Sequence, residues 1–232
     1  MQLFECNGCG FVWLDPLPNG GEISALYDDA YAGATTGYFN KVQSKLARAR
    51  GRVRYVVRRL SNGATGKTFL DVGANGGFMA KAAQDAGFSV CGVEPDPVSV
   101  AYAREHYPGI TFLKGLLEDS DLKSQSFDVI YCSEVIEHVA DSNRFVAKLA
   151  SVMKPGGLLY ITTPDIGHWR RPKDITRWDA FCPPSHCVYF SPNNLRLLLE
   201  RHGFEVSHRR FAWKPGIKII ARRRVDQALP IN

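Results

Sequence analysis

The feature that most constrains this chain is a regular alternation of apolar strand-like runs with helical segments from residue 68 onward. Strands are predicted at 68–72, 89–93, 111–113, 127–132 and 158–163, with helices at 77–86, 97–106 and 143–153 among them. Such alternation predicts a parallel sheet with helices on both faces. A helix at 192–202 then precedes two strands, 204–211 and 216–221, that we expect to pair antiparallel. The predicted fold class is α/β, a doubly wound, mostly parallel seven-stranded sheet with a C-terminal antiparallel hairpin.

Length and composition favour one main globular domain. Of the 232 residues 45% are hydrophobic and 22% charged, so the chain can bury a sizeable core without a disulfide scaffold. No apolar stretch approaches the roughly 20 residues that span a bilayer. The N-terminus also lacks the basic and apolar pattern of a secretory signal. We therefore expect a cytoplasmic protein with no membrane span, and the sequence leaves the oligomeric state open.

The N-terminal part differs in character from the main domain. We expect residues 1–37 to form a knuckle and cap segment and residues 38–232 to form the main domain, entered through a helix at 38–60. Cys6 and Cys9 have the spacing of half a zinc site, because two thiolates three positions apart can hold one tetrahedral ion from one side. The other ligands would come from a pair upstream of the present start, or from Cys182 and Cys187.

The net charge of +6 is concentrated locally, since residues 41–59 contain eight cations and no acid. Two interpretations are open. The cations form either a solvated helix surface or a field that attracts an anionic substrate, such as a phosphorylated sugar or RNA. Charge alone does not choose between them.

A glycine-rich turn joins the first strand of the main domain to its helix. Asp71, Gly73, Asn75 and Gly77 lie in this turn, where glycine lets a backbone come close to a ligand at the carboxyl end of a strand. Glu94 ends the next strand, seventeen residues beyond Gly77, and an acid there is placed to bind the hydroxyls of a ribose. Together they predict a cofactor that contains adenosine.

Asp71 distinguishes between two such cofactors. A carboxylate in the turn would repel the pyrophosphate of a nicotinamide dinucleotide but would hold the ammonium of S-adenosylmethionine. The turn also lacks the G-x-G-x-x-G spacing of dinucleotide binders. A dehydrogenase is therefore disfavoured, and S-adenosylmethionine is the predicted cofactor.

With these residues the chain resembles the class I S-adenosylmethionine-dependent methyltransferases, in their small-molecule branch, from about residue 68 to 221. The first motif of that family is D-x-G-x-G-x-G; Asp71, Gly73 and Gly77 match it, and Asn75 replaces the middle glycine. Asn tolerates a left-handed backbone better than most residues. The resemblance implies a Rossmann-like fold and places the ribose on Glu94.

The same resemblance assigns further roles. It implies that residues 115–119 frame the adenine, with Glu118 or Asp119 as its partner, and that Ser133 lies beside the methionine part of the cofactor. Cys6 and Cys9 resemble the second half of a zinc ribbon that precedes the domain in one subgroup. Members of that subgroup resemble enzymes that methylate sugars.

Four residues form a candidate catalytic or metal set. Glu134, Glu137 and His138 are expected on one face of a helix after the strand at 127–132, and His186 is expected to fold over the same pocket. Together they would suit Mg²⁺, Mn²⁺ or another divalent ion. The spacing resembles that of ubiquinone-pathway O-methyltransferases and of enzymes that methylate the terminal ribose of small RNAs. Two alternatives are a metal-free general base at His138 or His186, assisted by Glu137, and a purely structural role.

The resulting prediction is methyl transfer to a hydroxyl, or as second choice an amine, of a small polar acceptor that is anionic or sugar-like. Residues 164–191 are aromatic, cationic and irregular, which is typical of a substrate lid. One alternative is RNA terminal-ribose methylation, with nucleic acid as the partner of the basic helix. The other is a non-catalytic adapter that keeps the fold.

Overall fold

The structure is a computed structural model of the 232-residue chain and describes residues 2–18, 21–22 and 39–225. The predicted boundary near residue 37, between the N-terminal segment and the main domain, lies outside the described residues. No helix in the described ranges has the length and apolar character needed to cross a membrane.

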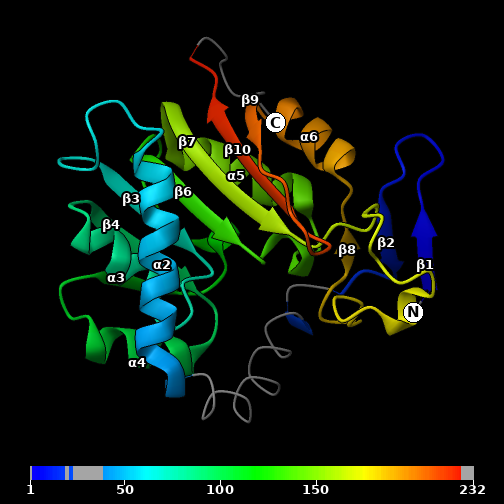
Figure 1. The fold of residues 1–232 in the computed structure, drawn as a ribbon, viewed down its shortest axis with the longest axis horizontal. Helices are drawn as coiled ribbons and strands as arrows, with labels where there is room; N and C mark the ends of the chain where they lie inside the picture. Colours follow the sequence, from blue (N-terminus) through cyan, green and yellow to red (C-terminus); the bar gives the residue numbers. More distant parts are fainter. Residues whose placement is uncertain (1, 19–20, 23–38, 226–232) are drawn as a thin grey trace.

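A seven-stranded sheet forms the centre of the main domain, as the sequence predicted (Figure 1). Five parallel strands come first in the spatial order and the antiparallel pair β10 and β9 closes one edge. The order across the sheet is β5 (Thr111–Lys114), β4 (Ser89–Glu94), β3 (Thr68–Val72), β6 (Phe127–Ser133), β7 (Met153–Thr163), β10 (Ile217–Arg223) and β9 (Phe204–Arg209). The observed strand ends lie within five residues of the predicted ones.

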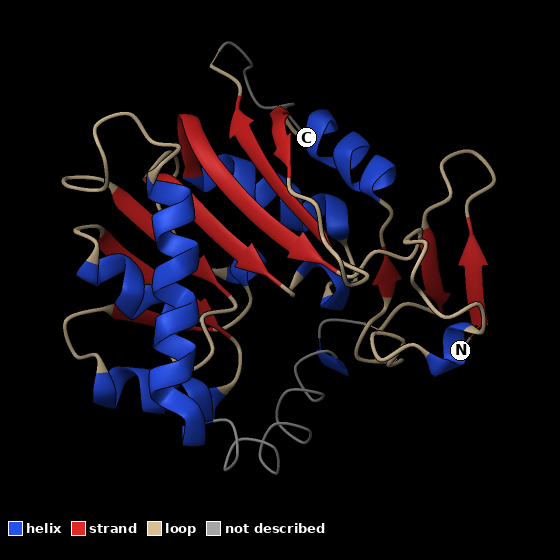
Figure 2. Cartoon of the chain, in the orientation of Figure 1, coloured by secondary structure: helices blue, strands red, loops and turns tan. Residues whose placement is uncertain are grey.

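Helices cover both faces of this sheet, which explains why its strands read as nearly continuous apolar runs. In β3, Phe69 packs toward α2 (Val42–Val57) and α3 (Phe78–Asp85), whereas Leu70 packs toward α5 (Ser142–Val152) and α6 (Pro192–Arg201). Figure 2 shows α2 in front of the strands. The side chains alternate because successive Cβ atoms of a strand point to opposite faces.

Local capping fixes where the helices begin. α4 (Pro97–His106) starts after Asp96, whose carboxylate accepts hydrogen bonds from the backbone N–H groups of Val98 and Ser99. α6 starts after Ser191, which forms a reciprocal capping box with Asn194. Both starts also carry proline in the first turn, where its missing N–H costs no hydrogen bond. These signals are local, so the predicted starts of α4 and α6 are confirmed.

The N-terminal segment forms a second, smaller sheet with part of the predicted lid. β1 (Gln2–Glu5) and β2 (Val12–Asp15) make an antiparallel hairpin, and β8 (Val188–Tyr189) pairs with β2. The two-residue β8 carries no periodicity of its own and is a strand only because β2 lies beside it.

Candidate functional site

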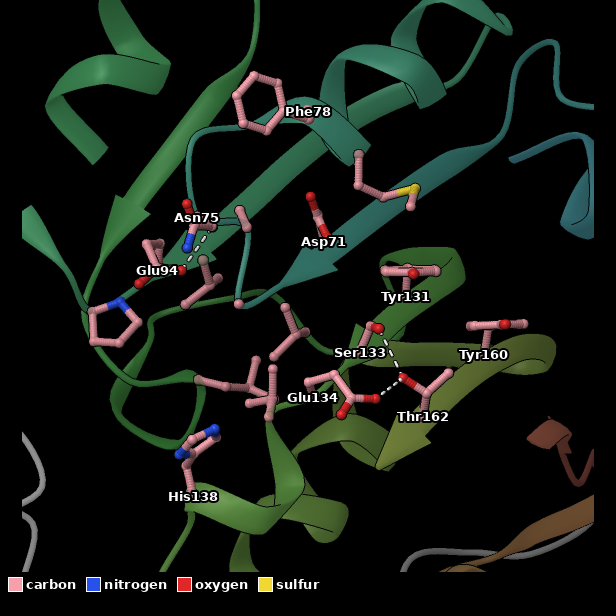
Figure 3. Close-up of a pocket in the computed structure, with 18 of the residues that line it drawn as sticks. Asp71, Asn75, Phe78, Glu94, Tyr131, Ser133, Glu134, His138, Tyr160 and Thr162 are labelled. Carbon is pink, nitrogen blue, oxygen red and sulfur yellow. Dashed lines mark hydrogen bonds between the residues drawn. The ribbon is translucent and has the colours of Figure 1, made fainter. Parts of the chain in front are cut away.

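A cavity of about 620 Å³ opens along the carboxyl ends of β3, β4, β6 and β7 (Figure 3). It includes the junction between β3 and β6, where the strand order reverses, which is the usual place for a ligand in an open α/β sheet. Its volume falls within the roughly 300–1,000 Å³ typical of small-molecule sites. The fold therefore offers one elongated crevice with room for a cofactor and an acceptor.

The turn after β3 adopts the backbone conformation that the sequence predicted. Gly73 has φ +71°, and a Cβ atom there would lie 2.5 Å from a methyl carbon of Val135. Asn75 has φ 45°, so its side chain is tolerated in the left-handed region. Both residues line the cavity. Gly77, which we expected to contact the cofactor, does not line the cavity; it is the residue before α3 and packs against α4 and β5.

Asp71 is buried at the end of β3, with 2% of its surface exposed. Its Oδ2 accepts a hydrogen bond of 3.0 Å from the backbone N–H of Ala80, in the first turn of α3. Burial, together with the nearby charge of Glu94, raises the pKa of Asp71 to about 8. A cationic ligand in the cavity would reverse that shift, because it would stabilise the carboxylate.

Glu94 ends β4 and holds the turn in place. Its Oε2 accepts from the backbone N–H of Asn75 at 2.7 Å and its Oε1 from the N–H of Asp96 at 2.9 Å. Burial raises the pKa of Glu94 to about 7. Each carboxylate oxygen has a second lone pair, so both can still accept from a ligand hydroxyl. The pair of oxygens in the cavity wall fits the two hydroxyls of a ribose.

The structure separates the two candidate partners of the adenine. Glu118 lines the cavity, and burial raises the pKa of its carboxyl. Asp119 instead bonds Arg144 at 2.7 Å on the surface, with 58% of its side chain exposed. Gly115 also lines the cavity and has φ +137°, a conformation that favours glycine. Of the two acids, Glu118 is the one on the cavity side.

The predicted helix that would carry Glu134, Glu137 and His138 on one face is wrong. β6 runs through Ser133, Glu134 has φ 57°, and only a short 3-10 turn, Ile136–His138, follows. The backbone N–H of Glu134 donates to the carbonyl of Thr162 on β7, which keeps it in the strand ladder. The side chain of Glu134 is also bonded to β7, because the hydroxyl of Thr162 donates to its Oε1 at 2.7 Å. The hydroxyls of Thr162 and Ser133 are hydrogen-bonded to each other, also at 2.7 Å.

Three of the four proposed metal ligands nevertheless come together. One ligand atom each of Glu137, His138 and His186 lie within 4.8 Å of one another. This is close to the roughly 3–4 Å that ligands at ~2.1 Å from one ion would show. Among the described residues, Glu134 is not part of this group. His186 arrives from the loop before β8, and its ring meets that of His138 edge to face at 4.5 Å.

Hydrogen bonds define the protonation of the two histidines. The Nδ1 of His138 lies 2.8 Å from the carbonyl of Ser185, and that of His186 lies 2.8 Å from the carbonyl of Ala180. Since a carbonyl only accepts, each Nδ1 carries the hydrogen and each neutral ring has its lone pair on Nε2. Burial lowers the pKa of His138 to about 4, helped by the charge of His186.

Glu137 is 1% exposed, and only one of its carboxylate oxygens is satisfied. Oε2 accepts from the hydroxyl of Thr163 at 2.9 Å, whereas the buried Oε1 has no hydrogen-bond partner within the described residues. Burial and the charge of Glu134 raise the pKa of Glu137 to about 8. A buried acceptor without a partner is costly, so Oε1 is open to a group from outside the described residues, such as a bound ligand.

Several cavity residues escaped the sequence analysis. Tyr131, Tyr160 and Thr162 come from β6 and β7, and Arg210 and Lys218 come from the C-terminal hairpin. The available signal was the two-residue spacing of polar side chains, at 131 and 133 and at 160 and 162, near the ends of otherwise apolar strands.

The predicted substrate lid does not reach the cavity in this structure. No residue of 164–191 is among the described residues that line the cavity.

Cys6 and Cys9 lie in the turn between β1 and β2. Hydrogen bonds from the backbone of Cys9 and Gly8 lower the pKa of the Cys6 thiol. Among the described residues, neither Cys182 nor Cys187 completes a three-ligand group with this pair. The substitution of those two cysteines for a missing zinc pair is therefore not supported, and zinc at Cys6 and Cys9 stays a prediction.

A doubly wound sheet with two buried acids and a glycine turn at adjoining strand ends defines a Rossmann-like protein with a nucleoside-binding crevice. Comparison with known proteins makes the class specific. The methyltransferase-domain family matches residues 42–209, more than half of the chain. The chain belongs to this family, within the class I S-adenosylmethionine-dependent methyltransferases.

Two curated relatives and one solved structure illustrate the likeness. A probable S-adenosylmethionine-dependent methyltransferase of Mycolicibacterium smegmatis is 31% identical over 151 residues, covering 65% of this chain and 57% of the relative. A ubiquinone biosynthesis O-methyltransferase of Bradyrhizobium is 26% identical over 158 residues, covering 60% and 62%. The chain thus spans about 57–62% of the length of these relatives. An S-adenosylmethionine-dependent methyltransferase structure from Mesorhizobium loti shares the fold, with a TM-score of 0.61, 21% identity and coverage of 73% and 96%.

Proposed function

We propose that this protein transfers the methyl group of S-adenosylmethionine to a hydroxyl of a small polar acceptor, a sugar or sugar derivative. One observation carries the proposal: buried Asp71 and Glu94 end neighbouring strands and open into one cavity. Glu94 would hold the ribose, Asp71 the ammonium, and Glu118 the adenine edge. The relatives named as ubiquinone biosynthesis O-methyltransferases support a hydroxyl over an amine.

When bound, the cofactor supplies an electrophilic methyl group whose bond to sulfur breaks as the new carbon–oxygen bond forms. The chain's part is to align the acceptor oxygen with that methyl group and to take the hydroxyl proton. We assign the proton to the Nε2 of His138, which lines the cavity and is neutral at pH 7. Because burial lowers the pKa of His138, the rate at saturating S-adenosylmethionine is expected to stay flat from pH 6 to 8, not to titrate near 6.5 as an unperturbed histidine would.

The cofactor assignment is tested by thermal unfolding with S-adenosylhomocysteine and, separately, with NADH. At 100 times its dissociation constant a ligand adds about 2.7 kcal/mol to the free energy of unfolding. For a chain of this size that is a rise in Tm of roughly 5–10 °C. We expect the rise with S-adenosylhomocysteine alone. A rise with NADH alone would contradict the proposal, and no rise with either would favour the non-catalytic adapter.

A second version of the mechanism uses a divalent cation held by Glu137, His138 and His186 in place of a metal-free base. It is favoured by the Oε1 of Glu137, which has no hydrogen-bond partner among the described residues. A carboxylate and two imidazoles suit Mn²⁺ and similar ions, and the Nδ1 hydrogen bonds would orient both rings. Of the three residues, His138 lines the cavity, whereas Glu137 and His186 do not. A bound cation would therefore polarise an acceptor hydroxyl that approaches from the side of His138, and would lower the pKa of that hydroxyl. In that case His138 is a ligand and not the base.

Calorimetric titration with MnCl₂ distinguishes the metal-dependent mechanism from the one in which His138 is the base. We expect Glu137→Gln to weaken Mn²⁺ binding at least 10-fold, because the variant loses the only anionic ligand of the group. Glu105→Gln is the matched control, since Glu105 is exposed on α4, outside the group, and should leave Mn²⁺ binding unchanged. Equal Mn²⁺ affinity in the wild type and Glu137→Gln, or full turnover after exhaustive chelation, would remove the metal and leave His138 as the base.

Methylation of RNA at a terminal ribose is the alternative enzyme activity, motivated by the basic α2. It requires an affinity for short RNA that falls steeply with salt, because phosphate contacts release counterions.

A further inference from the structure

The end of the cavity away from Glu94 has cationic walls, and the first wall is α2. Lys45, Arg48 and Arg52 line the cavity, three of the eight cations that the sequence placed in this region. Their spacing of three and four residues puts them in one stripe along the helix, beside the buried stripe that includes Ala49 and Val53. Three cations of the basic stretch therefore line the cavity, although Arg48 and Arg52 are also exposed to solvent.

The second wall comes from the C-terminal hairpin. Lys218 on β10 lies directly across the ladder from Thr162 on β7, so both side chains stand on the same face. The backbone N–H of Arg210 donates to the carbonyl of Lys218 at 2.9 Å, which fixes Arg210 next to it. Both cationic side chains line the cavity. Two elements more than 150 residues apart thus contribute cations to one site.

Two stacked phenols lie between these walls. Tyr131 and Tyr160 are parallel, with ring centroids 5.1 Å apart and planes at 4°. Arg52 donates from Nη1 to the hydroxyl of Tyr131 at 3.0 Å. Burial raises the pKa of Tyr160, and the charges of Arg52 and Arg210 oppose that rise. Both cations therefore act on the same phenol, from opposite walls.

The positive charges at this end of the cavity outnumber the carboxylates. Within the described part of the chain, Arg52, Arg210 and Lys218 form no ion pair, whereas neighbouring cations do: Arg50 lies 3.3 Å from Asp85 and Arg209 lies 3.8 Å from Asp165. Glu134 is the acid that acts on Tyr160. Asp71 acts on the neighbouring Tyr131, and the ammonium of a bound cofactor would balance the charge of Asp71. With the cofactor bound, the three cations and Glu134 leave an excess of two positive charges.

We propose that this end of the cavity binds a dianionic phosphate group of the acceptor, through Arg52, Arg210 and Lys218. The inference rests on the proposed methyl transfer and specifies its substrate class as a phosphomonoester. Two positive charges match a dianion better than a single carboxylate, and guanidinium forks suit phosphate oxygens. A phosphate bound here would hold an acceptor hydroxyl near Ser133, toward the cofactor end of the cavity. Holding the two reactants in this way makes the reaction effectively unimolecular and so raises its rate.

The test measures phosphate binding apart from cofactor binding. Protein saturated with S-adenosylhomocysteine is titrated calorimetrically, in a chloride buffer, with inorganic phosphate, glucose 6-phosphate and glucose. We expect the two phosphates to bind and glucose not to bind. Arg52→Gln and Lys218→Gln should each weaken phosphate binding at least about 10-fold through loss of a charge-assisted hydrogen bond. Arg54→Gln, on the same helix but outside the cavity, should change nothing.

Each other outcome overturns a specific claim. Equal weakening by Arg52→Gln and Arg54→Gln, together with tight salt-dependent binding of a short single-stranded RNA, would replace the phosphomonoester by RNA. No phosphate binding in a protein that binds S-adenosylhomocysteine would remove the phosphate site and leave the methyltransferase. If thermal unfolding shows no binding of S-adenosylhomocysteine, the phosphate titration is run without it. Phosphate binding that needs Arg52 would then keep the phosphate site and remove the proposed methyl transfer.

Discussion

An Asp71→Asn variant is expected to bind S-adenosylhomocysteine roughly 10- to 100-fold more weakly than the wild type, and yet to be more stable without ligand at high pH. The amide keeps an oxygen for the N–H of Ala80 but loses the charge that would hold the ligand ammonium. A hydrogen bond to a charged group contributes about 1.5–3 kcal/mol, which sets the expected loss of affinity.

The stability gain follows from the raised pKa of Asp71, about 8 in the folded protein. Between its ordinary pKa near 4 and this value, the folded state binds a proton that the unfolded state has released. The free energy of unfolding of the wild type therefore falls as pH rises from about 4 to about 8. Asn has no such cost, so at about pH 8.5 the variant should gain on the order of 2 kcal/mol.

Thermal unfolding between pH 5 and 9, with and without S-adenosylhomocysteine, measures both effects. In the wild type the ligand-induced rise in Tm should grow with pH, because the ammonium needs Asp71 ionised. Asp119→Asn is the control, since Asp119 lies on the surface and should alter neither quantity. Unchanged affinity in Asp71→Asn would show that this carboxylate does not contact the ligand.

A Gly77→Ala variant is expected to lose about 3 kcal/mol of stability, the largest folding effect among the predictions. Gly77 has φ +77°, and a Cβ there would lie 2.8 Å from the ring of Phe112 and 2.9 Å from that of Tyr107. A left-handed backbone costs an alanine roughly 1–2 kcal/mol, and overpacking a core adds about 1–3 kcal/mol. Since α3 packs on α4 and β5 through this point, neither ring can move freely.

A Gly66→Ala variant separates the cost of the left-handed backbone from the cost of overpacking. Gly66 has nearly the same backbone, with φ +74°, but nothing lies within 4 Å of an added Cβ. It should lose only about 1 kcal/mol, from the backbone. In thermal unfolding the fall in Tm is thus expected to be about 2–4 °C for Gly66→Ala and about three times that for Gly77→Ala. Equal falls would show that the contacts with Phe112 and Tyr107 are not tight.

The elements of the sheet and most of the proposed cofactor site were predictable because their signals are local. Apolar alternation marks the strands, and the caps at Asp96 and Ser191 mark two helix starts. Asp71, Asn75 and Glu94 sit at strand ends, and the parallel sheet brings its strand ends to one edge. Their placement in one cavity also depends on the strand order, in which β3 and β4 are neighbours; the alternation predicts the parallel sheet but not that order.

The acceptor end was not predictable in the same way. The helical face expected for Glu134, Glu137 and His138 failed because β6 extends through Ser133 and Glu134 remains bonded to β7. No pattern within ten residues reveals that bond. The same is true of β8, which is a strand only through its pairing with β2.

The sequence alone thus determined the fold class, the glycine turn and the two buried acids of the proposed cofactor site, since each depends on local backbone preference and hydrophobic period. The tertiary structure alone decided which distant side chains meet: His186 with His138, and the cations of α2 with those of the C-terminal hairpin. Which of these side chains come together depends on strand register and on the packing of α2 over the sheet. A contact between segments more than 150 residues apart leaves no periodic trace in either segment.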